Sequence, residues 1–186
     1  GEDYCDAFTN LTDDDTHEII SLIESDKFSG YWGGTNNVGI TEFMERFSIY
    51  GNEQLSGISL GVGKIFDGSI STDSEITIKV YNGSDLPETI IYSKNIFVKD
   101  LVQDAMNFIG FNEIIEPSDT FFVGFELSNM QPQDTFVVYQ SLRPANTDNY
   151  FYFKQNNVWQ DFEDANLGYN SVVNVFELVA CNIDDT

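Results

Sequence analysis

The chain has 186 residues, of which 31 are acidic and 8 are basic, and its formal net charge at pH 7 is −23. Phosphate backbones are bound by clustered lysine and arginine, so this balance excludes nucleic acid as a partner and disfavours anionic membrane surfaces. The chain is long enough for one well-filled core, and its 15% of aromatic residues favours strands. Divalent-cation binding, a saline environment and a plain solvated surface all stay open as reasons for the acidity.

The N-terminal part of the chain gives mixed signals. A short apolar patch over residues 4–8 is followed by an acidic run at 13–15. Apolar residues over 17–23 fit either a short helix that begins at Thr12 or Asp13, or a strand, and the context favours the strand. Residues 30–39 contain four glycines and two asparagines. That composition predicts a shaped loop with positive φ angles.

From residue 43 the pattern is that of β-structure. Residues 75–81 alternate strictly, which places Ile76, Ile78 and Val80 toward the core and the intervening residues, Tyr81 included, toward solvent. Further strands are predicted at 43–49, 55–66, 89–92, 96–101, 120–127, 135–139, 150–153, 158–159 and 172–179. These roughly nine to ten short strands, separated by turn signals, predict an all-β fold, an antiparallel sandwich or barrel.

The two cysteines, Cys5 and Cys181, lie near opposite ends of the sequence with none between them. We expect them to pair, because the first and last strands of a closed sandwich are often neighbours; two unrelated buried thiols are the alternative. A disulfide indicates a protein outside a reducing cytoplasm. No apolar run approaches the about 20 residues of a membrane helix, so we expect no membrane insertion. The chain lacks an initiator methionine, and we expect any leader peptide to be missing from this sequence.

Several segments together resemble jelly-roll-like modules of secreted Bacteroidetes proteins that use type IX secretion, which are related to the adhesin domains of gingipain-type proteases. The matching segments are Gly30-Tyr31-x-x-Gly34-x-Asn36-x-x-Gly39, the strand at 76–81, Leu86-Pro87 with the strand after it, Phe121-Phe122-Val123-Gly124-Phe125-Glu126, and Asn157-Val158-Trp159. The sequence departs from the pattern at Val38, where an aromatic residue is usual, and at Ile40, where aspartate is usual. The resemblance implies one jelly-roll-like β-sandwich over residues 1–186 with a core at about 5–181. It also implies a non-catalytic module, often stabilised by calcium.

No catalytic motif is present, and we expect no enzyme. His17 is the only histidine and no Gly-x-Ser-x-Gly elbow surrounds a serine, which disfavours a hydrolase triad, and the ligands for zinc are lacking. A small glycosidase is the alternative, because it needs only two facing carboxylates. Glu126 is the candidate, since burial in its apolar strand would raise the pKa of its carboxyl; a rim position at the strand end is the other interpretation.

Two acidic clusters are candidates for calcium, which takes six to eight oxygen ligands from carboxylates, carbonyls and water. The carboxylates in question are Asp13, Asp14, Asp15, Asp161, Glu163 and Asp164. Neither cluster has the spacing of an EF-hand. Each is also explained as a solvated loop.

A glycan ligand would stack on exposed aromatic rings. Trp32 is the main candidate, because it lies in the glycine-rich loop and has no counterpart in the resemblance; packing of this indole onto the core is the alternative. Tyr31 and Asn36 of the same loop complete the predicted ligand-binding set. Trp159 matches the resembling modules, which indicates a packing role.

Taken together, these observations predict a non-catalytic accessory or adhesion module of a secreted or cell-surface bacterial protein. We expect it to bind a glycan or an extracellular protein and to be joined to the rest of a larger secreted polypeptide. A carbohydrate-binding module proper and a small jelly-roll glycosidase are the alternatives.

Overall fold

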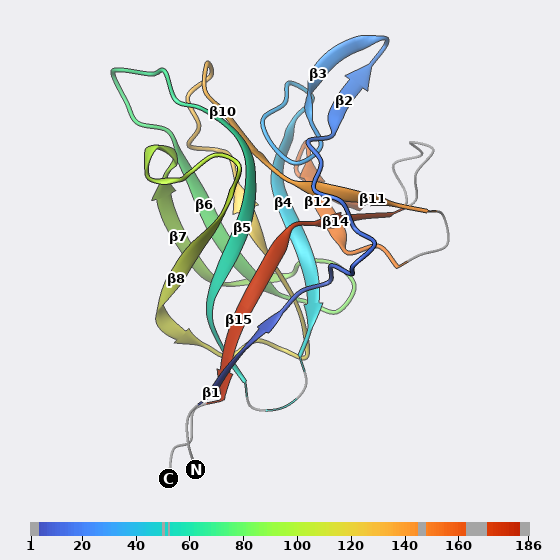
Figure 1. Ribbon diagram of the computed structural model, residues 1–186, viewed down its shortest axis with the longest axis vertical. Helices are drawn as coiled ribbons and strands as arrows, with labels where there is room; N and C mark the ends of the chain where they lie inside the picture. The colour runs from blue at the N-terminus through green and yellow to red at the C-terminus, as the bar shows by residue number, and fades with distance from the viewer. Residues whose placement is uncertain (1–3, 50, 52, 145–147, 163–170, 183–186) are drawn as a thin grey trace.

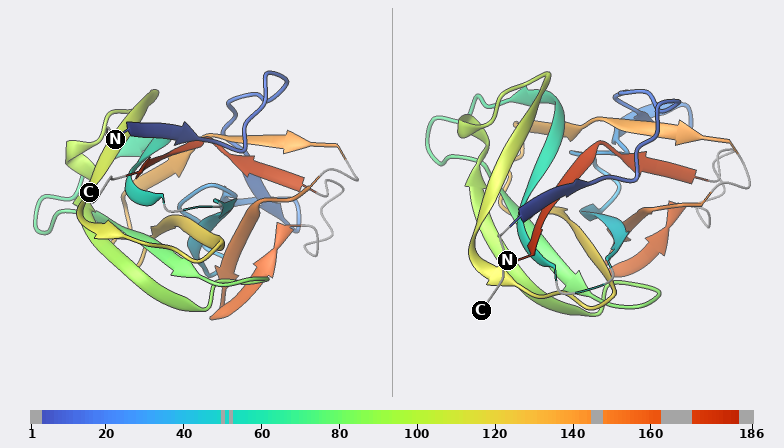
Figure 2. Two further views of the ribbon diagram at one scale, coloured as in Figure 1. Left: turned by 90° about the horizontal axis from the view of Figure 1, so that it is seen from below. Right: turned by 60° about the horizontal axis from the view of Figure 1, so that its bottom comes forward.

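The computed structural model describes residues 4–49, 51, 53–144, 148–162 and 171–182. Strands dominate this part of the chain, and its one short 3-10 helix is Val98–Asp100. No helix in these ranges is long and apolar enough to cross a membrane. Two large antiparallel sheets face each other across the core (Figures 1 and 2). The predicted all-β antiparallel sandwich is therefore confirmed.

The larger sheet has six strands in the order β13-β12-β4-β9-β6-β7, and every pairing in it is antiparallel. Its strands are β4 (Ile40–Ser48), β6 (Glu75–Asn82), β7 (Thr89–Phe97), β9 (Thr120–Glu126), β12 (Phe151–Gln155) and β13 (Val158–Asp161). At its centre, Phe43 on β4 pairs with Phe125 on β9, and their rings stack 4.9 Å apart. Gly124 is needed beside them, because a Cβ at this position would lie 1.8 Å from the Phe43 carbonyl oxygen.

The second sheet is built on one long strand, β5 (Gln54–Phe66). One edge of β5 pairs with β8 (Ala105–Ile115). The other edge pairs first with β15 (Phe176–Asn182) and then with β10 (Thr135–Val138). At the terminal end, β1 (Tyr4–Phe8) pairs with β15.

Two smaller ladders extend from these sheets. β11 (Gln140–Arg143) pairs with β14 (Ser171–Asn174), and the two continue directly into β10 and β15. At the junction, the Val175 amide donates to the Tyr139 carbonyl at 2.9 Å, and both residues also bond to Gly61 of β5, at 2.8 and 2.7 Å. The hairpin of β2 (Ser21–Glu24) and β3 (Lys27–Tyr31) projects from the sandwich (Figure 1).

The core lies between the sheets and is rich in phenylalanine. Its largest fully buried side chains include eight phenylalanines: Phe43, Phe121, Phe125, Phe136, Phe151, Phe153, Phe162 and Phe176. Burial of one such ring is worth about 1.5 to 3 kcal/mol. The high aromatic content therefore explains how a chain with strong self-repulsion stays compact.

The sequence prediction differs from this structure in four respects. The described residues form fifteen strands instead of nine or ten, because short ladders at both ends of the sandwich add to the long ones. Residues 89–97 form one strand, and β8 was not predicted. Tyr81 was expected to face solvent and is buried instead, with 5% of its surface exposed. The outer face of the larger sheet is thus itself partly buried.

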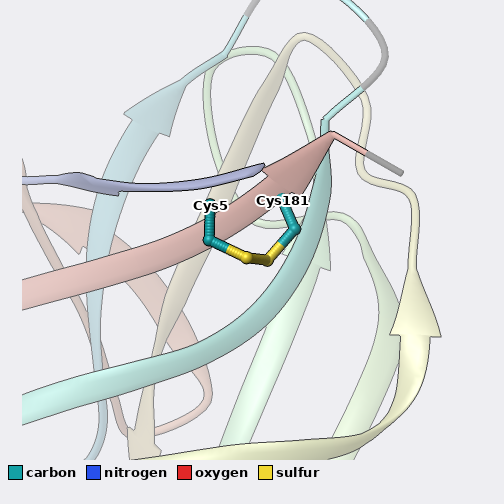
Figure 3. The surroundings of a disulfide bond; sticks show 2 residues. All are labelled: Cys5 and Cys181. Carbon is teal, nitrogen blue, oxygen red and sulfur yellow. A yellow bond between two sulfur atoms is a disulfide. The ribbon is translucent and has the colours of Figure 1, made fainter. Parts of the chain in front are cut away.

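The expected disulfide is confirmed (Figure 3). Cys5 and Cys181 occupy directly opposite positions on β1 and β15, with Cα atoms 4.0 Å apart and an S–S distance of 2.03 Å. The bond joins two residues that are 176 positions apart in the sequence. In Figure 1 the start of β1 and the end of β15 accordingly lie side by side at one end of the sandwich.

Candidate functional site

The outer face of the six-stranded sheet carries a second, smaller apolar cluster. Side chains alternate along a strand, so the neighbours of the core residues Phe43, Val80 and Phe153 point away from the core. Those neighbours are largely buried against one another, and the half-buried indole of Trp159 packs on them; the buried members are Met44, Tyr81, Phe122 and Tyr152. Tyr81 meets Trp159 edge to face, with ring centroids 5.5 Å apart. The sheet thus presents an aromatic surface on its outer side.

Charged groups converge beside this aromatic cluster. Glu42 is 4% exposed, and its Oε1 accepts hydrogen bonds from the Tyr81 hydroxyl at 2.6 Å and from Lys79 Nζ at 3.2 Å. Its Oε2 lies 3.3 Å from Lys154 Nζ. Lys79 also pairs with Glu126, which stands opposite Glu42 on the neighbouring strand. We call this set the charged aromatic face; its members are Glu42, Lys79, Tyr81, Glu126, Lys154 and Trp159.

The pKa values on the charged aromatic face reflect these pairings. Burial alone would raise the pKa of Glu126, but the hydrogen bonds from Lys79 and Ser128 outweigh burial and hold it below its usual value. Burial likewise opposes the charge on Lys79, yet its carboxylate partners raise the pKa of that amine. Burial and the neighbouring Glu42 raise the pKa of the Tyr81 hydroxyl. The expectation of a raised pKa at Glu126 was wrong, because Lys79 supplies a counter-charge.

Basic side chains lie against aromatic rings on this side of the sheet. Lys154 Nζ is 5.6 Å from the ring centroid of Trp159, and Lys79 Nζ is 5.9 Å from that of Tyr81. Farther along β4, the Arg46 guanidinium lies 5.9 Å from the ring centroid of Tyr152. Three of the eight basic residues of the chain are therefore gathered on one sheet face. Each is within the range of a cation–π interaction.

The glycine-rich loop predicted for ligand binding is held by its own hydrogen bonds. Asn36 Nδ2 donates to the carbonyls of Gly34 and Ile40, at 3.0 and 2.9 Å, and Asn36 Oδ1 accepts from the amides of Val38 and Ile40, both at 3.1 Å. The side chain of Asn36 thus fixes the loop, with both ends of its amide engaged.

The aromatic residues of that loop are also engaged. Trp32 is half-buried and meets Phe153 and Phe162 edge to face, at 5.5 and 5.3 Å. Tyr31 ends β3, where Lys64 donates a hydrogen bond of 2.9 Å to its hydroxyl. A ligand contact by Trp32, Tyr31 or Asn36 stays a prediction. Among the described residues, none of the three makes a hydrogen bond or ring contact with a member of the charged aromatic face.

The acidic clusters proposed for calcium separate in the structure. Asp13 and Asp14 are exposed in a turn, whereas Arg143 donates to both carboxylate oxygens of Asp15, at 3.0 and 2.6 Å. Asp161 is half-buried on β13, and Glu163 and Asp164 lie outside the described residues. Within the ranges that the structure describes, no three acidic, histidine or cysteine side chains converge as metal ligands. Calcium binding by either cluster stays a prediction.

A buried acid lies on the opposite, inner side of β4. Glu45 is fully buried, and burial raises its pKa to about 8 against the opposing effect of its hydrogen bonds. Its Oε2 accepts a hydrogen bond from Asn10 Nδ2 at 3.0 Å. Its Oε1 accepts from the backbone and side-chain amides of Asn174. Gln140 extends the network by donating to Asn174 Oδ1 at 2.8 Å.

Sequence reasoning missed Glu42, Lys79 and Lys154 as site residues. Their signal is a charged residue within two positions of an aromatic one, in three strands far apart in sequence. Such a pattern identifies a site only once the strand order β12-β4-β9-β6 is known.

No protein-family model and no curated protein sequence matches this chain. Among solved structures, the chain is similar to one of Cwp84, a surface-layer-associated protein of Clostridium difficile, which contains cysteine protease and lectin-like domains. The TM-score is 0.53 at 11% sequence identity, over 76% of this chain and 32% of that chain. This chain therefore spans about a third of that protein's structure, and the likeness concerns the fold.

Proposed function

We propose that this chain is a non-catalytic, glycan-binding accessory module of a secreted or cell-surface protein, and that the charged aromatic face holds the glycan. The observation that carries the proposal is the stacking of basic side chains on aromatic rings beside two carboxylates, on one sheet face. Positive charge is scarce in this chain, so its concentration there, next to the half-buried Trp159, calls for a functional explanation.

The chemistry of the face suits a sugar. The apolar side of a pyranose ring packs on an aromatic ring, while its hydroxyl groups need fixed donors and acceptors. Trp159 offers the aromatic surface, and Lys154 and Glu42 lie beside it. The ion pairs hold these groups in place before a ligand arrives, which reduces the entropy lost on binding.

The same ion pairs favour binding over hydrolysis. A glycosidase needs one carboxyl that is protonated at working pH to act as the acid. Lys79 bonds to both Glu42 and Glu126, and it lowers the pKa of the latter. A small glycosidase is therefore the less favoured alternative.

The disulfide and the structural likeness support a secreted or surface-exposed setting. Disulfides persist in oxidising compartments. Both cysteines are engaged in the bond, so neither is free to serve as a protease nucleophile, and the presence of a lectin-like domain in the Cwp84 structure supports a binding module. The finer assignment, to adhesin-type modules of Bacteroidetes proteins within a larger polypeptide, rests on the sequence resemblance.

Stabilisation by calcium is a separate part of the proposal. Asp13, Asp14, Asp15 and Asp161 are its candidates among the described residues. The melting temperature in calcium is expected to exceed that in chelator. Equal melting temperatures in calcium and in chelator would contradict calcium stabilisation and would not affect the proposal of glycan binding.

A glycan array followed by calorimetry on the best ligand tests the proposed function. Trp159→Ala is expected to weaken binding about tenfold, through loss of the stacking surface. Val158→Ala is the matched control, because Val158 is the exposed neighbour on the same strand and faces the other way. Binding by Trp159→Ala at wild-type affinity, or an array with no ligand, would overturn the proposal.

A further inference from the structure

A groove lies at the end of the sandwich opposite the disulfide. It has a volume of about 250 Å³ and runs between the start of β4 and the connection from β9 to β10. The long strand β5 pairs with Cys181 at one end and with Thr135, next to the groove, at the other. Thirteen residues of strand span roughly 40 Å. The groove is thus remote from the joined chain ends.

The walls of the groove are fixed before any ligand binds. Asn36 forms one wall, with its amide fully engaged in the loop. Asp134 forms another, and its buried carboxylate accepts hydrogen bonds from the Gly68 amide and from the hydroxyls of Ser69 and Ser74. Ser74 in turn accepts from the Gln131 amide at 2.8 Å. A preformed cavity of this kind is typical of small-molecule sites.

The lining combines an apolar floor with free polar groups. Ile40, Leu127 and Met130 supply the apolar surface. The side chains of Thr41 and Gln131 also line the groove and make no hydrogen bond within the part of the chain that the structure describes. A hydroxyl and an amide held over an apolar floor match a ligand that is apolar on one side and carries hydroxyl groups at its edge.

The groove adjoins the charged aromatic face. Thr41 immediately precedes Glu42, and Leu127 immediately follows Glu126. The Leu127 amide bonds to the Thr41 carbonyl at 2.9 Å, so the two strands are still joined where the groove begins. Glu42 and Glu126 point to the outer face of the sheet, so a ligand would reach them from the groove by passing over the end of these two strands.

Size and charge restrict the ligand further. Sites for drug-sized ligands measure about 300 to 1,000 Å³, so a groove of about 250 Å³ takes a single ring. Asp134 in the wall, and the net charge of −23, repel anionic rings such as uronic and sialic acids.

We propose that the groove binds one neutral pyranose ring, the terminal residue of the glycan whose following residues cross the charged aromatic face. This inference rests on the proposed function and adds that the ligand is a neutral glycan recognised at its end.

Nuclear magnetic resonance of the labelled protein tests the groove by itself. The probes are the methyl glycosides of glucose, galactose, mannose and N-acetylglucosamine. At least one is expected to shift the amide signals of Thr41 and of residues 127–131. Thr41→Val should raise its dissociation constant about fivefold, the effect of one lost hydrogen bond. Thr77→Val is the control, since it removes a hydroxyl from the same sheet but outside the groove lining.

The outcomes separate the two proposals. Suppose that Trp159→Ala loses oligosaccharide binding, while Thr41→Val has no effect and the amide signals of residues 127–131 do not shift. The groove proposal would then be overturned, and the proposed role of the charged aromatic face would stand. Shifts around Trp159 alone on addition of the monosaccharides would also overturn the groove. If the monosaccharides shift the amide signals of the groove residues but the glycan array yields no ligand, the groove proposal would stand and the proposed role of the charged aromatic face would be overturned. Equal affinity for a neutral oligosaccharide with a free and with a blocked end would contradict recognition of the chain end.

Discussion

Glu45 and Asn174 are joined by two hydrogen bonds, because one carboxylate oxygen accepts both the backbone and the side-chain amide of Asn174 at 3.1 Å. The pair links the inner face of β4 to the end of β14, at a point where the two sheets meet. Glu45 has no ion-pair partner among the described residues, and its burial makes the charged form costly.

The free energy of unfolding is therefore expected to depend on the ionisation of Glu45. Its pKa is about 8 in the folded protein and close to 4.3 in the unfolded chain. The folded state holds this proton more tightly, so the contribution of Glu45 to stability is highest below about pH 4 and falls as the pH rises from there to about 8. Glu45→Gln should flatten this slope in urea titrations at pH 5 to 8. Glu113→Gln, at an exposed site, should retain it; an equal slope in both variants would contradict the assignment.

Asp15→Asn is expected to destabilise the protein by about 1.5 to 3 kcal/mol at pH 7, the usual loss for hydrogen bonds to a charged group. Arg143 donates to both oxygens of Asp15 and lowers the pKa of that carboxyl. This stability is present above the unfolded pKa and is lost as the pH falls below about 4. The gap between wild type and variant should therefore close in acid. Asp14→Asn, next to it in the turn and exposed, should cost little at any pH.

Lys79→Met should cost about 2 kcal/mol at pH 7, because it leaves Glu42 and Glu126 side by side without their shared cation. In the variant, the effect of burial is opposed only by Ser128 and Lys154, and the pKa of Glu126 should rise. Lowering the pH to 5 should recover much of the loss in urea unfolding. Lys99→Met, which removes an exposed ion pair, serves as the control; a similar cost there would contradict a special role for Lys79.

Asn36→Ala should lower the free energy of unfolding by about 2 kcal/mol, since it leaves two backbone amides without their acceptor. Asn37→Ala, at the exposed neighbouring position, should change stability little. Unchanged melting of Asn36→Ala together with lost glycan binding would instead assign Asn36 to the ligand, as the sequence suggested.

Replacement of both cysteines by serine should cost about 4 to 5 kcal/mol on the chain-entropy estimate for a loop this long. Glycan affinity should be unchanged, because the groove lies at the far end of β5. A reductant should lower the melting temperature of the wild type and leave that of the variant unchanged. Loss of binding in the folded variant would contradict this separation.

The sequence was sufficient to predict strands where one face is buried and the other is solvated. It failed where that assumption fails. Tyr81 follows the alternation of an outward residue, yet it is buried because Trp159 and Phe122 cover the outer face. Strand β8 was missed because its apolar residues Met106 and Phe108 are exposed, so its apolar residues do not mark one buried face.

The disulfide could be predicted because it depends on the first and last strands alone. The charged aromatic face could not, since it depends on which strands become neighbours. Glu42 and Glu126 are 84 positions apart in the sequence and directly opposite in the sheet. No local pattern encodes that pairing.

The position of the disulfide also sets the path of mechanical force. Tyr4 and Asn182 are opposite each other on β1 and β15, one residue beyond Cys5 and Cys181. A pull that separates Tyr4 from Asn182 reaches the sulfur atoms after a single residue on each side, and tension then runs through the covalent bond. The 175 residues enclosed by the bond carry none of it. Once the bond is reduced, the same pull would unzip β1 from β15 one pair at a time.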